Sequence, residues 1–360
     1  MLNVALSIVL LVLGLALVAV ALRSAIFTFI LPRSANDPLT RFVFVSIRML
    51  FNLRLRHLDT YEERDHLMAL YAPVSLVALP PVWLAFVSIG YALIYRAIVT
   101  PSWQGAFFTS GSSLLTLGNM PLTSFPEAVV SFTEATLGLL LVAVLISYLP
   151  TMYSAFSRRE MAVNLLDVRA GSPPSAVEML ARYHRIHGLD QLGKLWETWE
   201  TWFADIEETH TSLAALAFFR SPQPDRSWVT AAGAVLDAAS LADSTVDIPR
   251  DPHSNLCIRA GYLALRRIAD FFLIAYNPNP TAADPISISR EEYDAACQQL
   301  IDQGLKLKPD RDKAWRDFVG WRVNYDTPLL ALAALTMAPY APWSSDRSLL
   351  IWRRFRPRRG

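Results

Sequence analysis

Residues 101–121 of the chain read PSWQGAFFTSGSSLLTLGNMP. The stretch is rich in apolar and small residues and has no charged side chain. The roughly dozen residues before Thr116 are too few to cross a bilayer, which takes about 20, yet the stretch is more apolar than an ordinary loop in water. Non-helical backbone is tolerated at membrane depth only where it is buried in protein or lines a water-filled cavity. We therefore expect a re-entrant segment, with a short helix at about 104–115 that dips into the membrane and an extended return.

Long apolar segments lie on both sides of this stretch. Residues 67–98 precede it and residues 128–156 follow it, and each is long enough to span a membrane. Pro80 and Pro81 should kink the first of them, because proline removes a backbone donor. A third segment, residues 2–22, contains no charged residue. We interpret it as a retained anchor and not a cleaved signal peptide, because no basic residue precedes it and it is longer than the roughly 7–15 apolar residues of a signal core.

The composition indicates an apolar first half and a soluble second half. Hydrophobic residues make up 53% of the 360 residues and charged residues only 18%, against about 25% charged residues in soluble domains. The first 156 residues contain 8 Lys and Arg and 7 Asp and Glu, whereas the last 204 contain 25 of each. The net charge of +1 excludes a nucleic-acid-binding protein that relies on bulk positive charge. The only cysteines are Cys257 and Cys297, which excludes a disulfide scaffold.

The arginines predict the orientation, since loops that face the cytoplasm carry the excess of Lys and Arg. No Lys or Arg occurs between Arg96 and Arg158, whereas six arginines lie within residues 32–66. We therefore expect the N-terminus outside, residues 32–66 inside, residues 99–127 outside and the C-terminal half in the cytoplasm. These expectations describe a multi-pass protein of the plasma membrane, for example of a bacterial inner membrane. The six arginines are Arg33, Arg41, Arg48, Arg54, Arg56 and Arg64.

Residues 41–57 mix arginines with large apolar residues. This composition is typical of an amphipathic helix that lies in the plane of the membrane interface, with its apolar face toward the acyl chains. Membrane lipids are therefore expected partners of the segment. Its apolar residues include Phe42, Phe44, Ile47, Leu50, Phe51 and Leu55.

The order of segments within residues 67–160 resembles the pore domain of the two-transmembrane potassium channel superfamily: an outer helix, a short pore helix, a Thr-x-Gly filter and an inner helix. In that family the pore helix often carries an aromatic pair followed by Ser or Thr. The matching residues here are Phe107, Phe108, Thr109, Ser110 and, further along, Ser113 in the pore helix, and Thr116, Leu117 and Gly118 in the filter. Asn119, Met120 and Pro121 depart from the aromatic residue, second glycine and aspartate that usually follow.

The resemblance implies a homotetramer that conducts potassium. Four chains around an axis would point the carbonyls of Thr116, Leu117 and Gly118 inward, so that backbone oxygens replace the hydration shell of a monovalent cation. A glycine suits this path because alternating carbonyl directions require positive φ, and we assign Asn119 to the end of the filter. The helix at 104–115 would direct its partially negative C-terminal end at the cation. The departure after Gly118 shortens the column of carbonyls, so a cation pathway is a firmer expectation than potassium selectivity.

Three residues of the apolar segment 128–156 have two interpretations each. Glu134 is either part of an ion pathway, as intramembrane carboxylates often are, or a hydrogen-bond partner of pore-helix hydroxyls such as those of Ser112 or Ser113. Gly138 and Pro150 are either a hinge and a gate of the inner helix, or a position for close helix packing and the end of the span.

The C-terminal half is expected to be an α-helical domain. Residues 161–175 are assigned to a linker, residues 176–345 to the domain, and residues 346–360 to a basic tail that serves as a membrane-surface anchor or a solubilising end. Apolar residues repeat with a helical period over 176–219, with a break at Gly188. The strand and glycine-rich turn of a dinucleotide-binding domain do not occur. Further helices are expected at 228–241, 255–276, 289–307, 310–323 and 329–341.

Histidines in this half leave one alternative open. His184 and His187 share a helix face and, with Glu207, Glu208 or His210, could bind zinc. The simpler interpretation is that the two histidines are solvated surface residues.

These patterns give three hypotheses of function. The first is a tetrameric channel for a monovalent cation, with no cofactor, regulated by a cytoplasmic helical domain whose ligand is unknown. In it, residues 1–32 are the first transmembrane helix, residues 33–66 a linker helix and residues 67–160 the pore domain. The second is a non-conducting membrane receptor or scaffold with a degenerate pore. The third is a membrane-anchored metal-dependent enzyme. No set of nucleophile and base can be recognised in the C-terminal half, so we do not expect an enzyme.

Overall fold

A computed structural model describes residues 4–29, 37–100 and 102–347 of the chain. The chain forms two compact units. Unit 1 comprises residues 1–58 and 67–154, and unit 2 comprises residues 59–66 and 155–360. Pro101 and most of the basic tail assigned to residues 346–360 lie outside the described residues.

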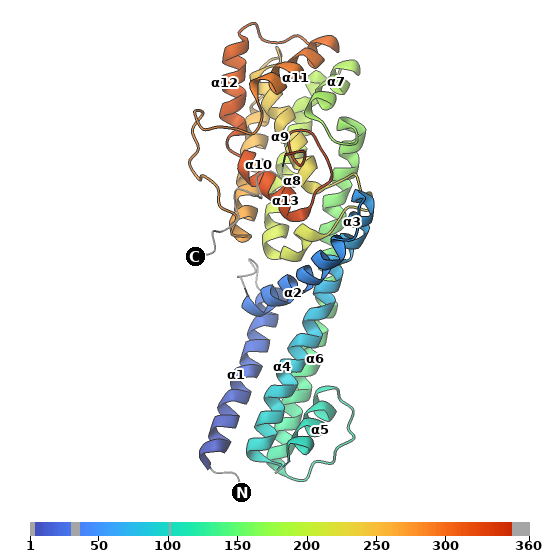
Figure 1. Ribbon diagram of the computed structural model, residues 1–360, viewed down its shortest axis with the longest axis vertical. Coiled ribbons are helices and arrows are strands. Elements are labelled where there is room, and N and C mark those ends of the chain that lie inside the picture. The colour runs from blue at the N-terminus through green and yellow to red at the C-terminus, as the bar shows by residue number, and fades with distance from the viewer. Residues whose placement is uncertain (1–3, 30–36, 101, 348–360) are drawn as a thin grey trace. The chain divides into compact units, whose positions relative to one another are not determined.

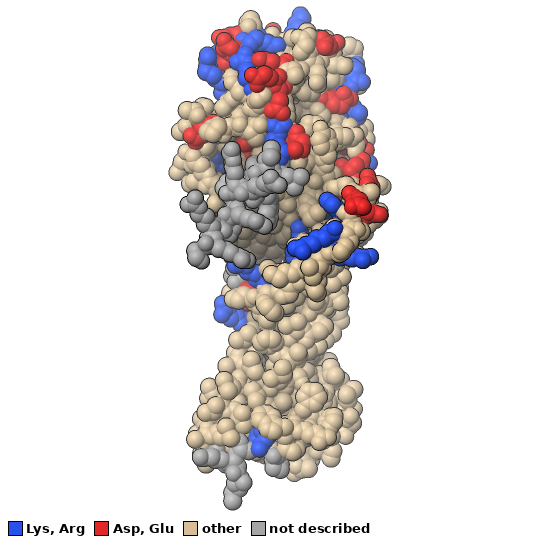
Figure 2. Space-filling view, in the orientation of Figure 1, with Lys and Arg blue, Asp and Glu red and all other residues tan. Residues whose placement is uncertain are grey.

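The described residues contain no β-strand, and one isolated bridge joins Val246 to Leu307. The expected all-α class is therefore confirmed. Three helical stretches are long and apolar enough to cross a membrane, as expected. They are α1 (Val4–Phe29), α4 (Tyr71–Ile98) with the preceding α3 (Tyr61–Ala69), and α6 (Phe125–Ala170). α4 remains one helix through Pro80 and Pro81. Figure 2 shows few charged side chains over α1, α4 and α5 and many over the helices of unit 2.

α1 and α4 pack side by side within unit 1 (Figure 1). Two glycines let their backbones approach closely. A Cβ atom added at Gly14 would lie 2.5 Å from the carbonyl oxygen of Gly90, and one added at Gly90 would lie 2.8 Å from that of Gly14. Small residues at such crossings are typical of helix pairs in membranes, where close van der Waals packing replaces the hydrophobic driving force. The first apolar helix is therefore an integral part of unit 1.

α6 is a single helix of 46 residues. It continues through Pro150, although proline removes a backbone donor from a helix interior. The linker expected at 161–175 is therefore too long, because the residues up to Ala170 are helical. The turn begins at Gly171, whose φ of +79° is the left-handed conformation that commonly ends a helix.

Two shorter helices complete unit 1. α2 (Pro38–Leu55) corresponds to the amphipathic helix expected at 41–57. It begins after the N-cap residue Asp37, whose carboxylate accepts a hydrogen bond from the backbone N–H of Thr40. α5 (Trp103–Leu114) corresponds to the short helix expected at 104–115. Its re-entrant position in a membrane stays a prediction.

Unit 2 is a helical domain arranged around α9 (Trp228–Ser244), which is buried on nearly all sides. Figure 1 shows α9 among α7, α10, α12 and α13, which all contact it. The other helices are α7 (Ala176–Arg185), α8 (Leu192–Ser212), α10 (Pro252–Phe271), α11 (Arg290–Asp302), α12 (Arg311–Arg322) and α13 (Asp326–Thr336), with 3-10 turns at Leu189–Gln191 and Ala214–Phe218. The predicted break near Gly188 is confirmed, whereas α13 begins and ends before the helix expected at 329–341.

The crossing of α1 and α4 is testable by substitution. Gly90→Val should weaken it, because the new side chain must displace the backbone of Gly14 or the side chain of Val18. Overpacking of this kind costs about 1–3 kcal/mol, so we expect a lower melting temperature of the protein in detergent, measured by circular dichroism. Gly111→Ala is the matched control, since a Cβ atom there meets nothing within 4 Å and alanine favours a helix. Equal melting temperatures of the two variants would contradict the close crossing.

Candidate functional site

α5 turns its hydroxyl-bearing face toward the protein interior. Thr109, Ser110, Ser112 and Ser113 are all buried. The hydroxyl of Ser110 donates a hydrogen bond to Glu134 Oε1 at 2.6 Å and lies 3.0 Å from the carbonyl oxygen of Ser88 on α4. A buried hydroxyl needs such partners, because leaving it unpaired away from water costs about 1–3 kcal/mol. The hydroxyl face of α5 therefore holds α4, α5 and α6 together.

Glu134 is the carboxylate of this network, and its side chain has no exposed surface. The interpretation of Glu134 as a hydrogen-bond partner of a hydroxyl on the short helix is confirmed, but the donor is Ser110 and not Ser112 or Ser113. The hydroxyl of Ser113 lies instead 2.7 Å from the hydroxyl of Ser131. The two contacts are thus three residues apart on each helix. Ser113 follows Ser110 by three residues on α5, and Ser131 precedes Glu134 by three residues on α6. The Oε2 atom of Glu134 has no hydrogen-bond partner among the described residues.

Gly138 lies where α6 approaches the C-terminal end of α5. A Cβ atom added at Gly138 would lie 2.5 Å from the carbonyl oxygen of Leu114. This contact favours the interpretation of Gly138 as a position for close helix packing. Pro150 lies 12 residues further along the same helix, about 18 Å away at 1.5 Å per residue. The structure does not bring Pro150 to the rest of the site, and the helix does not end there.

The expected filter residues form a hydrogen-bonded turn directly after α5, in place of an immediate extended return. The backbone N–H of Leu117 donates to the carbonyl of Ser112 at 2.8 Å, and that of Thr116 donates to the carbonyl of Ser113 at 3.1 Å. This pair of bonds is a Schellman motif, in which the residue after the C-cap is left-handed and is usually glycine. Here that residue is Thr116, with φ of +52°. A β-branched residue in this region is uncommon and strained by about 1–2 kcal/mol.

The turn continues with Gly118, whose φ is +65°. The positive φ expected at this glycine is therefore present. Beyond it, the backbone N–H groups of Asn119 and Met120 both reach the hydroxyl of Ser112, at 3.1 and 3.3 Å. Thr116, Leu117, Gly118 and Asn119 are all exposed in the single chain. The assigned filter residues are thus close together, tied to the end of α5, and open on their outer side.

The aromatic residues of α5 point away from the hydroxyl face. Trp103, Phe107 and Phe108 are between 52% and 58% exposed, and Leu115 and Leu117 beside them are 57% and 61% exposed. A contiguous apolar surface of this kind marks a place where protein or lipid packs. Phe107 and Phe108, which the resemblance places in a pore helix, are therefore available to a neighbouring molecule and not part of the core of unit 1.

Several polar residues of this site were not singled out from the sequence. Tyr91 OH donates to the hydroxyl of Thr133 at 3.2 Å, and Tyr95 OH lies 3.3 Å from that of Ser113. With Ser88, these tyrosines follow the i, i+3, i+7 spacing of one helix face within an apolar helix. Polar residues in that pattern were the signal that could have identified the face of α4 that receives α5.

Unit 2 contains a second buried polar group, centred on Arg159. Its guanidinium donates to the carbonyl oxygens of Leu216 and Phe219, each at 2.8 Å, and pairs with Glu160 at 2.7 Å. His210 Nε2 lies 3.4 Å from the same guanidinium. Burial and the positive charge of Arg159 hold the pKa of His210 well below its usual range. The imidazole is therefore neutral near pH 7 and can accept from Arg159.

The zinc site considered from the sequence has no ligand set in the part of the chain that the structure describes. No group of three His, Cys, Asp or Glu side chains there could hold a metal ion. His184 and His187 consequently do not meet Glu207, Glu208 or His210 in a metal-binding arrangement.

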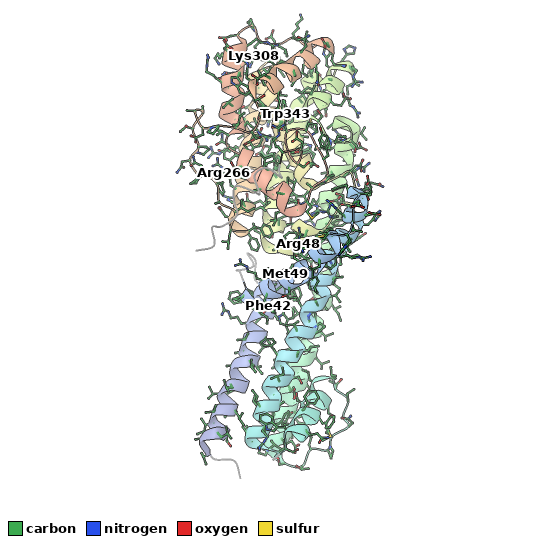
Figure 3. The ribbon with its side chains drawn as sticks, viewed as in Figure 1. Phe42, Arg48, Met49, Arg266, Lys308 and Trp343 are labelled. Atoms are coloured by element: carbon green, nitrogen blue, oxygen red, sulfur yellow. The ribbon has the colours of Figure 1, made fainter. Side chains whose placement is uncertain are left out.

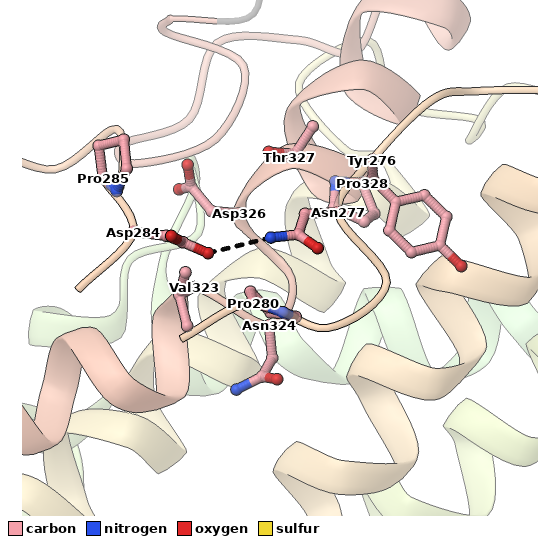
Figure 4. Close-up of a pocket in the computed structure, with 10 residues that line it drawn as sticks. All are labelled: Tyr276, Asn277, Pro280, Asp284, Pro285, Val323, Asn324, Asp326, Thr327 and Pro328. Atoms are coloured by element: carbon pink, nitrogen blue, oxygen red, sulfur yellow. Dashed lines mark hydrogen bonds between the residues drawn. The ribbon is translucent and has the colours of Figure 1, made fainter. Parts of the chain in front are cut away.

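The core of unit 2 holds an ionic cluster beside a small pocket. Arg322 of α12 is fully buried and pairs with Asp237 at 2.6 Å and Asp326 at 2.7 Å. Burial opposes the charge of this guanidinium, but the two carboxylates outweigh burial and raise the pKa of Arg322 above its ordinary value. The pocket has a volume of about 240 Å³ (Figure 4). Of its two carboxylates, Asp326 is committed to Arg322, and Asp284 accepts from the side chain of Asn277 at 3.0 Å.

No protein-family model, no curated protein and no solved structure matches the chain. The arrangement of α5 between α4 and α6 therefore has to be interpreted from its own chemistry.

The contact between Ser110 and Glu134 is expected to stabilise unit 1. Glu134→Ala should lower the melting temperature in detergent, because it leaves the buried hydroxyl of Ser110 without this acceptor and opens a cavity; the loss should be about 1–3 kcal/mol. Glu134→Gln, which keeps an oxygen acceptor, should be milder. Thr136→Ala is the control on the same helix, since its exposed hydroxyl bonds only the carbonyl of Phe132. If Glu134→Ala and Thr136→Ala had the same melting temperature, the claim that the contact between Ser110 and Glu134 stabilises unit 1 would be wrong.

Proposed function

We propose that four copies of the chain assemble around an axis and form a pathway for a monovalent cation, potassium being the ion that the resemblance implies. Unit 1 would span the plasma membrane with the N-terminus outside, and unit 2 would be a cytoplasmic regulatory domain. The observation that carries the proposal is the clamping of α5 between α4 and α6, which leaves the Thr116–Asn119 turn exposed at the end of a short helix.

Electrostatics supports a cation as the ligand of this turn. The C-terminal end of a helix carries about half a negative elementary charge. α5 ends at Leu114, and the turn that follows has no charged side chain. Backbone and hydroxyl oxygens are therefore the groups that could coordinate a cation at this turn. Oxygens of this kind replace the hydration shell of a monovalent cation in a filter.

The need for several copies follows from geometry. One exposed turn offers oxygens on one side only, whereas a cation that sheds its water must be surrounded. The apolar residues beside the turn supply a surface for a neighbour, since Phe107, Phe108 and Leu117 are exposed in the single chain. Closed cyclic assemblies of identical chains satisfy both requirements.

The composition of unit 2 supports a regulatory role. It includes residues 59–66, which lead directly into α4, and the part of α6 beyond Ser154. Arg220 holds the first of these segments: it pairs with Asp65 and donates to the carbonyl oxygens of Thr336 and Met337 at the end of α13. Arg159 holds α6 to residues after α8. A rearrangement inside unit 2 would thus act on both helices that enclose α5.

One observation favours the second hypothesis, a non-conducting receptor or scaffold. Thr116 lies in a hydrogen-bonded turn with positive φ, and Asn119 and Met120 follow where the channel family has an aromatic residue and a second glycine. A turn of this kind does not present a straight column of carbonyls. The same fold could then serve as a structural support for unit 2.

Flux measurements separate the two functions. Liposomes that contain the purified protein should take up potassium, and Gly118→Ala should abolish most of the uptake. A side chain at φ +65° is strained, at a cost of about 1–2 kcal/mol, which lowers the population of the native turn by roughly five- to thirty-fold. Gly111→Ala, the same substitution within α5, should conduct normally.

Wild-type flux in Gly118→Ala would overturn the assignment of the filter. Tetramers of the wild type that pass no cation would favour the receptor or scaffold.

A further inference from the structure

The inner face of α2 is packed on α4. The ring of Tyr71 lies 6.2 Å from that of Phe44 and 5.8 Å from that of Phe51, and its hydroxyl donates to the carbonyl of Phe44 at 3.3 Å. Val43 is buried on the same side. These contacts fix which face of α2 is turned toward the helices of unit 1.

The opposite face of α2 is also apolar, yet it is exposed. Phe42, Val45, Met49 and Leu53 follow the spacing of one helix stripe and are 68%, 44%, 62% and 55% exposed, and Leu50 beside them is 65% exposed. We call these five residues the outer face of α2. Figure 3 labels Phe42 and Met49 along the helix. An apolar stripe along most of a helix is unusual on a surface that meets only water.

Arginines border the outer face. Arg41, Arg54 and Arg56 are exposed, and no Asp or Glu occurs within residues 38–58. Basic side chains also gather over α2 in Figure 2. Arg48 differs from the others, since its guanidinium lies 5.1 Å from the centre of the Tyr71 ring. The surface is therefore apolar along its length and has arginines toward its two ends, with no acidic residue within α2 itself.

Hydrogen bonds hold the first turn of α2 against the last turns of α1. The carboxylate of Asp37 accepts from the hydroxyl of Ser24 at 2.6 Å, and the hydroxyls of Thr28 and Thr40 lie 2.7 Å apart. Trp83 Nε1 of α4 donates to the same Ser24 hydroxyl at 2.9 Å. Because α1 is long and apolar enough to cross a membrane, α2 starts where such a crossing ends.

We propose that the outer face of α2 lies in the headgroup region of the bilayer and that its arginines bind anionic phospholipids. Five large apolar side chains would enter the boundary of the acyl chains, as amphipathic helices in the membrane interface do. Guanidinium groups match phosphate oxygens with paired hydrogen bonds, and a negative leaflet attracts each arginine near its surface. The proposal rests on unit 1 spanning a membrane, as the proposed function does, but it does not require that the protein conducts.

The depth of the outer face can be measured in the full-length protein. Cys257 and Cys297 are buried, so a fluorophore attaches selectively to Met49→Cys. In vesicles of phosphatidylcholine and phosphatidylglycerol that contain brominated lipids, the fluorophore at 49 should be strongly quenched. Leu256→Cys, at an exposed leucine of α10, is the control and should not be quenched. Equal quenching at the two sites, or a fluorophore at 49 shielded from both lipid and water by another protein chain, would overturn the proposal.

The preference for anionic lipid has its own test. Arg41→Gln, Arg54→Gln and Arg56→Gln combined should retain less phosphatidylglycerol, counted by native mass spectrometry after purification, by up to about fivefold per arginine. The matched control removes three exposed arginines of unit 2, Arg250, Arg259 and Arg316, and should retain the wild-type number. Equal retention by both triple variants would overturn the assignment of the arginines. Neither measurement uses ion flux, so failure here and failure of the channel are separate results.

Discussion

A carboxyl group buried among apolar helices must find its hydrogen-bond donors inside the protein, because no water is available to replace them. Glu134 meets this requirement at Oε1 through the hydroxyl of Ser110, whereas its Oε2 atom has no hydrogen-bond partner among the described residues. The contact sets the register of α5 on α6, and the pairing of Ser113 with Ser131 follows from the same register. With its hydroxyl face turned inward, α5 has to leave its aromatic face outward. The exposed aromatic residues and the open turn after Leu114 are thus consequences of where the polar side chains are satisfied.

Charged side chains within each unit hold segments at the ends of the apolar helices. Asp37 fixes α2 to the end of α1 through Ser24. Within unit 2, Arg220 secures the segment before α4, and Arg159 secures the last part of α6. Each of these charged groups is paired or hydrogen-bonded where it is buried, as the cost of an unpaired buried charge demands. A membrane pore regulated by a soluble domain would need such fixed points at both helices.

Much of the fold could be predicted from the sequence, because apolar length and turn residues are local signals. The uncharged run at 2–22 predicted α1, and the stretch before Thr116 predicted a short helix that the structure has as α5. Gly188 marked the break in the first helices of unit 2. The linker expected at 161–175 begins too early, because the charged residues Arg158, Arg159 and Glu160 were taken to end the inner helix, whereas α6 continues to Ala170 and the left-handed Gly171 follows it.

The partners within the site could not be predicted from spacing alone. Ser110, Ser112 and Ser113 lie within one turn of α5, and the rotation of that helix on α6 decides which of them reaches Glu134. The contact of Arg220 with Asp65 joins residues 155 positions apart, so no local pattern signals it. The turn at Thr116 was also not predicted, because a β-branched residue such as threonine rarely adopts positive φ.

The central claim is that the turns after α5 from several copies meet around one axis. Cysteine cross-linking of Leu117→Cys in membranes tests it directly, since both native cysteines are buried and Leu117 is exposed. The account predicts disulfide-linked dimers of Leu117→Cys under mild oxidation and none for Val9→Cys, a position on α1 that is also exposed. A Leu117→Cys chain that stays monomeric while Val9→Cys cross-links would contradict it.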